Sequence, residues 1–316
     1  MSLVDIIVPV YKPDEKLDKL IGMLGRQTVS PDNIFLMVTL SGDESVDDEL
    51  IRKLVRLEKV TVTTLPKRVF DYGATRNKGV SFSDAEFILF MTQDAVPEDE
   101  YLVQKLLSAF DDTKVASAYA RQLADVRTNP IESFTRLFNY PKQSCIKSKE
   151  DIPTLGIKTY FCSNVCAMYR RSVFGELGGF TCHVILNEDS IFAASVIEAG
   201  YTIAYVADAK VNHSHMYTNM QYLRRNFDIA VSHRQFNKVF DAVPSESEGI
   251  RLVKTTAVNL IKTGRWRVLP ELVLKSGFKY AGYFLGKRYR HLPKPLVISL
   301  SMNKAYWKKG FKDEND

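Results

Sequence analysis

The chain has 316 residues, of which 45% are hydrophobic, 25% charged and 11% aromatic. This composition excludes a disordered chain and is typical of one large or two smaller globular domains. No run of eighteen apolar residues occurs, so we expect no membrane-spanning helix. Residues 3–10 have an acid within an apolar run and no basic leader, which is not typical of a signal peptide. Four cysteines are too few for a disulfide scaffold, and we expect reduced thiols.

The net charge of +6 is distributed unevenly along the chain. Residues 251–312 hold fifteen Lys and Arg and a single acid, Glu271, whereas residues 1–250 have a balance of −5. An acidic body therefore precedes a basic extension, and we expect the two parts to contact different partners. We predict a main domain over residues 1–240 and a helical extension over residues 241–316.

The first part of the chain alternates apolar strands with amphipathic helices. Strands are expected at residues 4–10, 33–40, 59–65, 86–92 and 115–122. Helices are expected at residues 14–27, 47–57, 72–80 and 98–110. The alternation predicts an α/β fold, a Rossmann-like, mainly parallel sheet with helices on both faces. Such sheets bind ligands at the carboxyl ends of their strands.

Beyond residue 125 the pattern is less regular. Further strands are expected at residues 159–169 and 201–206, and further helices at residues 189–199 and 219–238. Neither a G-x-G-x-x-G nor a G-x-x-x-x-G-K-[ST] motif occurs, which disfavours a Rossmann dehydrogenase and a P-loop NTPase.

A single carboxylate, Asp94, follows the strand expected at residues 86–92. Divalent cations prefer oxygen ligands, often one or two carboxylates together with substrate phosphate oxygens. Asp94 is therefore a candidate metal ligand. The alternative interpretation is that Asp94 caps the helix expected near residue 98.

Two histidines, His213 and His215, follow the last strand of the body. In an extended segment, side chains at positions i and i+2 share a face, and a neutral ring nitrogen of either could bind a metal ion. The alternative is a pair of surface histidines in a loop.

Two acids, Glu188 and Asp189, stand at the start of an expected helix. Acids suit the first turn of a helix, and Asn187 is a natural cap, so a purely structural role is one interpretation. The other is a general base beside a substrate hydroxyl.

Residues 70–79 open another helix and include Gly73 and Arg76. A helix N-terminus with a nearby guanidinium suits a diphosphate, although an ordinary solvated turn would have the same residue types.

These segments, in this order, resemble the motifs of the family 2 glycosyltransferases with the GT-A fold, over residues 3–240. The matching segments are Pro9-Val10-Tyr11 (P-x-Y), Thr92-Gln93-Asp94 (D-x-D), Glu188-Asp189 (the catalytic acid pair), Val211-x-His213-Ser214 (the metal-binding histidine) and Gln221-x-x-Arg224-Arg225 (Q-x-x-R-W). Within the family, T-Q-D-A-x-P and Phe70-Asp71-x-Gly73-x-x-Arg76-Asn77 are similar to the rhamnosyltransferases of streptococcal rhamnose-polysaccharide synthesis. Three positions depart from the pattern, because Thr92, Thr39 and Arg225 stand where the family has Asp, an acid and Trp.

The resemblance implies an inverting transferase that moves L-rhamnose from dTDP-rhamnose to a hydroxyl of a lipid-linked, growing cell-surface polysaccharide. It implies Asp189 as general base beside Glu188, and Mn²⁺ or Mg²⁺ held by Asp94 with His213 or His215. The residues implied in donor binding are Pro9, Tyr11, Thr39, Asp71, Arg76, Gln93, Asp94, Arg224 and Arg225. Two alternatives remain open: a transferase that uses UDP-galactose or UDP-N-acetylglucosamine, and a non-catalytic sugar-nucleotide-binding protein.

The basic extension combines its charges with aromatic residues and is expected to be helical. Its aromatic residues are Trp266, Phe278, Tyr280, Tyr283, Phe284, Tyr289, Tyr306, Trp307 and Phe311. This combination suits the surface of an anionic membrane and predicts a peripheral protein on the cytoplasmic face of the cell membrane. The helices could instead form a homodimer interface. We expect no nucleic-acid partner, because no binding motif occurs and the acidic body would repel phosphates.

Overall fold

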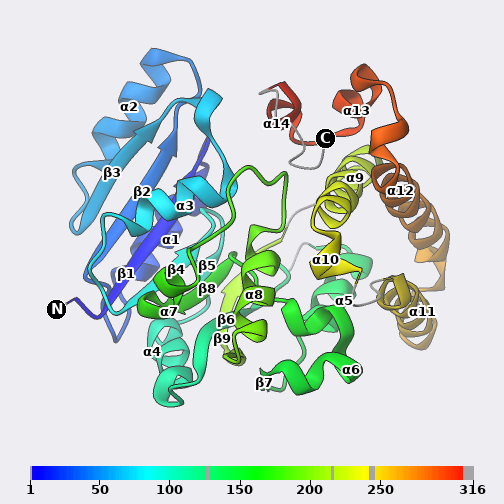
Figure 1. The fold of residues 1–316 in the computed structure, drawn as a ribbon, viewed down its shortest axis with the longest axis horizontal. Coiled ribbons are helices and arrows are strands. Elements are labelled where there is room, and N and C mark those ends of the chain that lie inside the picture. The colour runs from blue at the N-terminus through cyan, green and yellow to red at the C-terminus, as the bar shows by residue number, and fades with distance from the viewer. Residues whose placement is uncertain (1, 126–127, 215–216, 242–245, 309–316) are drawn as a thin grey trace.

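The computed structural model of the chain describes residues 2–125, 128–214, 217–241 and 246–308, and within them a nine-stranded sheet surrounded by helices (Figure 1). The strands are β1 (Val4–Val10), β2 (Asn33–Thr39), β3 (Val60–Leu65), β4 (Phe87–Met91), β5 (Val96–Pro97), β6 (Val115–Leu123), β7 (Cys145–Lys147), β8 (Cys166–Arg170) and β9 (Thr202–Asn212).

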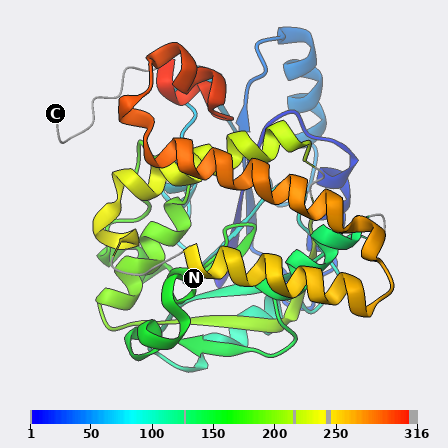
Figure 2. The same cartoon turned by 90° about the vertical axis from the view of Figure 1, so that its right-hand side faces the viewer.

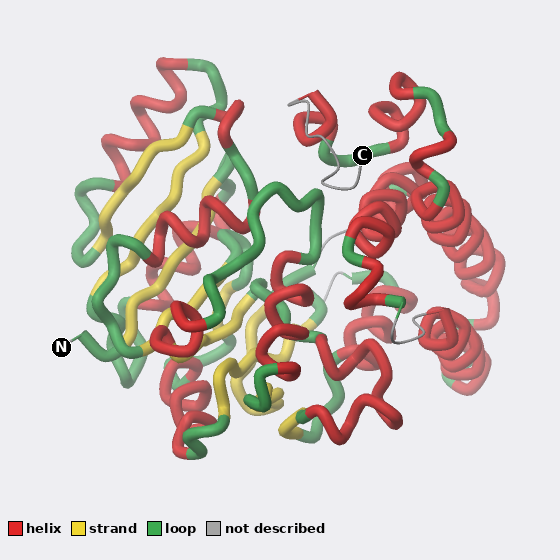
Figure 3. The backbone as a smooth tube through the Cα atoms, in the orientation of Figure 1, coloured by secondary structure: helices red, strands yellow, loops and turns green. Residues whose placement is uncertain are grey.

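The helices follow the strands along the chain and then continue alone to the C-terminal side (Figure 3). They are α1 (Glu15–Leu24), α2 (Glu44–Leu54), α3 (Tyr72–Val80), α4 (Leu102–Leu107), α5 (Pro130–Asn139), α6 (Ile152–Leu155), α7 (Arg171–Glu176), α8 (Glu188–Glu198), α9 (Asn219–Gln235), α10 (Asn237–Phe240), α11 (Glu246–Lys262), α12 (Leu269–Lys287), α13 (Lys294–Leu300) and α14 (Lys304–Lys308). Short 3₁₀ helices cover Lys67–Val69, Ser108–Asp111, Lys149–Asp151, Gly156–Tyr160, Trp266–Val268 and Tyr289–His291. The predicted α/β class is confirmed.

The sheet has the strand order β3-β2-β1-β4-β8-β6-β9-β5, with β7 also paired to β9. The strands β1, β2, β3 and β4 pair in parallel, as predicted. The strand β8 enters antiparallel between β4 and β6, and β5 and β7 are antiparallel to β9, whereas β6 and β9 are parallel. The parallel half therefore continues into a mixed half, and the carboxyl ends of β1, β2 and β4 lie at one edge.

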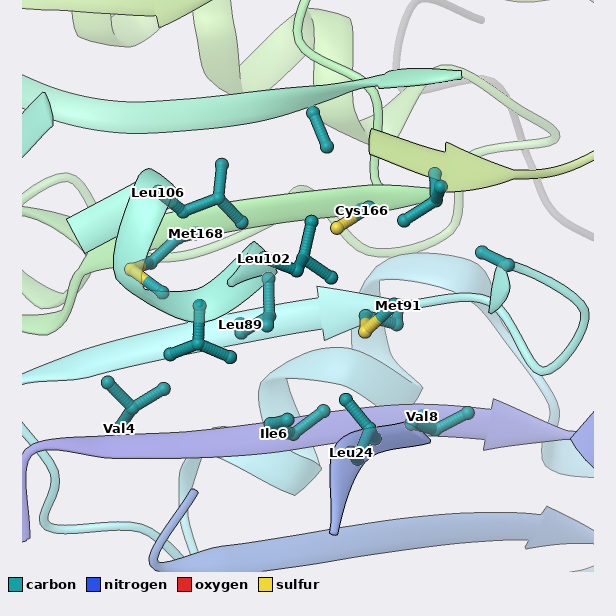
Figure 4. Close-up of a cluster of buried hydrophobic side chains, with 14 of the residues drawn as sticks. Val4, Ile6, Val8, Leu24, Leu89, Met91, Leu102, Leu106, Cys166 and Met168 are labelled. Atoms are coloured by element: carbon teal, nitrogen blue, oxygen red, sulfur yellow. The ribbon is translucent and has the colours of Figure 1, made fainter. Parts of the chain in front are cut away.

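Alternate residues of the central strand β1 enter two separate cores. Ile6 and Val8 belong to the core that also contains Leu24 of α1 and Leu102 of α4, and in Figure 4 Leu24 lies beside Ile6 and Val8. Ile7 belongs to the opposite core, which includes Phe192 of α8. A strand that is buried on both faces needs such a continuous apolar run, which explains the pattern of residues 4–10.

The helix expected at residues 98–110 begins only at Leu102, and Tyr101 occupies its N-cap position. The cause is a long-range contact, because Val96–Pro97 forms β5 and pairs with β9. Asp94 lies upstream of β5 and is not a helix cap, so that alternative interpretation is wrong.

The prediction of a strand at residues 159–169 is wrong for the first half of this range. A 3₁₀ helix covers Gly156–Tyr160, and the strand covers only Cys166–Arg170. The buried ammonium of Lys147 donates hydrogen bonds to the carbonyls of Lys158 and Phe161, which holds this segment out of the sheet.

The basic extension forms α11, α12, α13 and α14, and these helices pack onto the body rather than extending away from it. Figure 2 shows α11 and α12 side by side across one face of the molecule. One apolar cluster joins α9, α13 and α14 with the loop before α8; its members are Ile185, Phe227, Val231, Tyr289, Val297 and Tyr306. The domain boundary predicted at residue 240 therefore falls between α9 and the helices α12, α13 and α14, on which α9 packs. Within the described part of the chain, no helix has both the length and the apolar character needed to cross a membrane.

The helices α9 and α12 approach closely at two glycines. A Cβ atom on Gly282 would lie 2.1 Å from the carbonyl oxygen of Leu223, and one on Gly286 would lie 2.3 Å from that of Phe227. Only glycine allows this separation, because a backbone carbonyl cannot rotate aside as a side chain can.

We expect Gly282→Ala to lower the free energy of unfolding by about 1–3 kcal/mol, since the added methyl group must force α9 and α12 apart. The control is Gly277→Ala in the same helix, where an added Cβ meets no atom within 4 Å. Alanine is the better helix former, so this variant should be as stable as the wild type or up to ~1 kcal/mol more stable. Urea unfolding measures both, and equal losses would contradict the close contact.

Candidate active site

The ends of β1 and β4 are joined by one side chain. Gln93 Oε1 accepts a hydrogen bond from the Tyr11 N–H at 2.8 Å, and Gln93 Nε2 donates to the Tyr11 carbonyl at 3.1 Å. Two ammonium groups lie near the Tyr11 ring, that of Lys12 at 5.8 Å and that of Lys67 at 5.2 Å from its centroid. An aromatic ring flanked by cations suits a nucleotide and its phosphates. Tyr11 and Gln93 belong to the family motifs, whereas neither lysine does.

Thr39 ends β2 at the same edge of the sheet, one residue beyond the pair of Val10 with Val38. It is buried, and its hydroxyl has no hydrogen-bond partner among the described residues. Pro9 is partly exposed in β1. The buried hydroxyl of Thr39 is therefore a polar group that a ligand at this edge can satisfy.

The structure brings Asp94 and His213 together, with Asp94 Oδ2 3.5 Å from His213 Nε2. On the other side of the ring, Gln122 Oε1 lies 3.0 Å from His213 Nδ1 and also accepts from the Arg136 guanidinium. Because a guanidinium only donates, the facing atom of Gln122 is its oxygen, and Nδ1 of His213 therefore carries the proton. In the neutral imidazole the lone pair is then on Nε2, the nitrogen that lies 3.5 Å from Asp94. His215 lies outside the described residues.

The donor set of Asp94 and His213 suits a divalent cation. A carboxylate oxygen and an imidazole nitrogen are ligands for Mn²⁺, and the carboxylate also for Mg²⁺. Among the described residues no group of three or more His, Cys, Asp or Glu side chains is arranged to hold a metal ion. Such a cation would therefore need substrate phosphate oxygens and water as further ligands, which is usual for these metals.

Asp189 lies in the first turn of α8, with backbone hydrogen bonds to both carboxylate oxygens. The N–H of Asn164 donates to Oδ2 at 3.2 Å, and the N–H of Ser190 donates to Oδ1 at 2.7 Å. Burial, together with the neighbouring Glu188 carboxylate, raises the pKa of Asp189 to about 6. Asn187 holds the N-cap position in a left-handed conformation (φ 70°) and makes no side-chain cap bond. A carboxylate with this pKa is ionised at neutral pH and can accept a proton.

Glu188 forms a buried ion pair with Arg76, at 3.0 Å and with both side chains 6% exposed. The same guanidinium donates to the Tyr72 carbonyl at 3.2 Å, and Glu188 also accepts from the Asn164 side chain at 3.4 Å. Arg76 therefore fixes Glu188 beside Asp189. Both bonds come from Nη1, and Nε of Arg76 has no partner among the described residues, so the diphosphate contact stays a prediction.

Asp71 is also held by the protein itself. Its Oδ1 accepts from the Ala74 N–H at 2.7 Å, which caps α3, and its Oδ2 accepts from the His183 N–H at 3.0 Å. Asp71 therefore caps α3 and holds the loop at residue 183. Its contact with the nucleotide base stays a prediction, because each carboxylate oxygen can accept a further hydrogen bond.

The two arginines of α9 lie in different surroundings. Arg224 Nε donates to the carbonyl of Ser299 in α13, at 3.2 Å. Arg225 lies over the Tyr217 ring, 5.9 Å from its centroid. Burial raises the pKa of Tyr72, and the Arg225 charge opposes this rise, which places Arg225 on the side of α9 that faces the start of α3. Arg225 therefore lies nearer the start of α3, whereas Arg224 is bonded to α13, and both donor contacts stay predictions.

Three residues between the 3₁₀ helix and β8 connect both halves of the site. Ser163 Oγ accepts from Gln122 Nε2 at 3.0 Å, which links it to the histidine. Asn164 contacts both acids, and the Val165 carbonyl accepts from the Thr92 N–H at 3.1 Å. Gln122, Ser163 and Asn164 were not predicted from the sequence, because none of them belongs to a motif. Their only signal is polarity within stretches that are otherwise apolar.

Comparison with known proteins gives a consistent result. The sequence profile described as glycosyl transferase family 2 matches residues 5–178. The chain is 37% identical over 306 residues to the O-antigen chain rhamnosyltransferase RfbN of Salmonella typhimurium, covering 96% of each chain. It is 38% identical over 305 residues to the O-antigen chain rhamnosyltransferase WbaN of Salmonella anatum, covering 96% of this chain and 95% of the relative.

The fold is similar to that of a solved glycosyltransferase. The mannosyltransferase PcManGT from Pyrobaculum calidifontis, in complex with GDP-Man and Mn²⁺, superposes with a TM-score of 0.55 at 15% identity, covering 98% of this chain and 85% of that one. The GT-A fold expected from the motifs is confirmed.

Proposed function

Because the chain belongs to glycosyl transferase family 2, we propose that it transfers L-rhamnose from dTDP-rhamnose to a hydroxyl of a lipid-linked, growing cell-surface polysaccharide. The observation that carries this proposal is the similarity, along 96% of the chain, to two relatives named O-antigen chain rhamnosyltransferases. A lipid-linked acceptor places the reaction at the membrane, and we assign it to the cytoplasmic face. A purely binding function is disfavoured by Asp189, whose pKa of about 6 suits proton transfer.

Asp189 acts as the general base in this proposal. As the acceptor oxygen forms its bond to the anomeric carbon, Asp189 takes the hydroxyl proton. The bond from that carbon to the diphosphate breaks, and its electron pair leaves with the diphosphate. Attack from the face opposite the diphosphate inverts the anomeric configuration. The backbone N–H groups of Asn164 and Ser190 hold the carboxylate in place for this step.

Asp94 and His213 would hold the divalent cation, with the Asp94 carboxylate and His213 Nε2 as ligands. When bound there, Mn²⁺ or Mg²⁺ neutralises negative charge that develops on the departing diphosphate. Gln122 keeps Nδ1 of His213 protonated and so keeps Nε2 available. Lys12 and Lys67, beside the Tyr11 ring, add fixed positive charge at the nucleotide end.

The donor assignment predicts selective stabilisation by thymidine nucleotide. A ligand at 100 times its Kd stabilises the fold by about 2.7 kcal/mol, so thermal unfolding with dTDP, UDP or GDP, each with and without Mn²⁺, ranks the donors. We expect the largest rise in Tm with dTDP and Mn²⁺, and transfer from dTDP-rhamnose but not from UDP-galactose or UDP-N-acetylglucosamine. Preference for UDP would discard rhamnose as the sugar, and no response to any nucleotide would contradict the donor site.

A further inference from the structure

The helices α11 and α12 expose apolar side chains on the side away from the body. The most exposed are Val273 (69%), Tyr280 (70%) and Trp266 (60%). We call the outer face the surface formed by Ile250, Ile261, Trp266, Val273, Tyr280 and Phe284, all of which are exposed. Apolar residues gathered on two adjacent helices mark an interaction surface, whereas single ones do not.

The helix α12 has two apolar sides. One side is buried against α9 at Gly282 and Gly286. The other exposes Val273, Tyr280 and Phe284, whose spacing of seven and four residues places them on one stripe. The buried side accounts for the packing of α12 on α9, and the exposed stripe, which that packing does not use, is available to a partner.

Positive charge surrounds the outer face. Arg265 and Arg267 are exposed in the turn between the helices, and the Arg267 guanidinium lies 5.4 Å from the centroid of the Trp266 ring. At the other end of α12, the Arg288 guanidinium lies 3.7 Å from the centroid of the Phe284 ring. Glu271, the single acid of residues 251–312, is paired with Lys275 at 2.8 Å. The partner must therefore be both apolar and anionic.

We propose that the outer face docks on the surface of a lipid bilayer that contains anionic lipids. The apolar and aromatic side chains enter the interfacial layer, and the guanidinium and ammonium groups contact lipid phosphates. A second copy of the chain is the less suitable partner, because it would bring two segments that each carry a balance of +14 into contact. This docking deepens the proposed function, whose acceptor is lipid-linked, and it rests on residues outside the candidate active site.

Docking in this way places the site near the bilayer. In Figure 1, α9 lies between α8 and α12. On the side opposite the two glycines, the Ser232 hydroxyl of α9 donates to the Leu186 carbonyl at 2.7 Å, in the loop that leads to Glu188 and Asp189. A single layer of helix, ~8–10 Å between neighbouring axes, therefore separates the docked helix from the loop that carries the acids.

Vesicle flotation of the full chain tests the proposal. Wild-type protein should float with vesicles of phosphatidylcholine and phosphatidylglycerol in equal parts, but not with phosphatidylcholine alone. Arg265→Gln with Arg267→Gln should lower the partition coefficient roughly thirtyfold. The triple variant Trp266→Ser, Val273→Ser, Tyr280→Ser should no longer float. The matched control is Val46→Ser, Val55→Ser, Phe82→Ser, which removes exposed apolar side chains of the body and should float like the wild type.

Failure of wild-type protein to float, or an equal loss in the control, would overturn the proposal. A dimer of the wild-type protein, measured by light scattering, would also overturn the proposal if the triple variant were monomeric but still floated. A second copy of the chain would then be the partner of the outer face. Transfer to a water-soluble acceptor is measured in parallel. If dTDP-rhamnose is not a donor while flotation behaves as expected, the proposed function fails and the docking surface remains.

Discussion

Replacing Asp189 with asparagine is expected to lower sugar transfer by roughly 10²–10⁴-fold, the usual contribution of a positioned general base. Asparagine has nearly the same shape, and its side-chain oxygen can still accept from the Asn164 N–H. It cannot take the hydroxyl proton. Donor binding, measured by calorimetry with dTDP, should be unchanged, because Asp189 contacts the acceptor and not the nucleotide in the proposed mechanism.

The pH dependence provides a second test of Asp189. The carboxylate must be ionised to act as a base, so wild-type transfer should fall as the pH drops through about 6, and the residual rate of Asp189→Asn should lack this step. The folded-state pKa lies above the ordinary value of an aspartate, so the ionised carboxylate lowers the stability of the fold at higher pH. Asp189→Asn should therefore unfold at no lower temperature than the wild type at pH 8.

Asp228 offers the matched control, because burial also raises the pKa of this carboxyl to about 6. Its Oδ2 accepts from the N–H groups of Met302 and Asn303, which hold it to the segment between α13 and α14. Asp228→Asn should keep its transfer activity. Wild-type rates in Asp189→Asn, or equal losses in both variants, would show that Asp189 is not the base.

Replacing Asp94 with asparagine is expected to remove the response to Mn²⁺. The amide keeps the size of the side chain but loses the negative charge that a divalent cation requires. The loss in transfer should be about 10²-fold or more, because a cation at the diphosphate contributes several kcal/mol to the transition state. The change in Tm on adding Mn²⁺ with dTDP gives a readout that does not depend on turnover, and in Asp94→Asn it should disappear.

Asp99→Asn is the control for this variant, five positions along the chain. Asp99 pairs with Lys105 at 2.7 Å on the partly exposed surface, and such a pair contributes only ~0–1 kcal/mol. This variant should respond to Mn²⁺ like the wild type. If Asp94→Asn keeps the same Mn²⁺ midpoint, the cation is bound by other residues.

Elements fixed by local contacts could be predicted from the sequence. The bounds predicted for α3 are those observed, Tyr72–Val80. The helix begins there because the Asp71 side chain accepts a hydrogen bond from the N–H of Ala74, three positions along the chain. The pairing of Asp94 with His213 followed from the family motifs, and the structure confirms that the two side chains meet. Each of these predictions needed only neighbouring residues or a motif.

Contacts between distant segments could not be predicted. Gln122 reaches His213 across 91 positions, and Asn164 reaches Asp189 across 25. No periodicity or motif marks such polar residues, since their role depends on which strands become neighbours. The aromatic residues of the basic extension show the same limit, because Tyr289 and Tyr306 are buried in the core around α9 while Trp266 and Tyr280 are exposed.

The packing of α9 also has a consequence for synthesis on the ribosome. Residues 5–178, which match the family profile, leave the ribosome first. The loop with Leu186 is held by α9, and α9 is completed by Gly282, Gly286 and Tyr306 near the end of the chain. Synthesis proceeds at about 5–20 residues per second. The helices that support the loop of Glu188 and Asp189 are therefore made several seconds after the sheet. The loop that carries Glu188 and Asp189 therefore gains its full support only after the C-terminal helices have been synthesised.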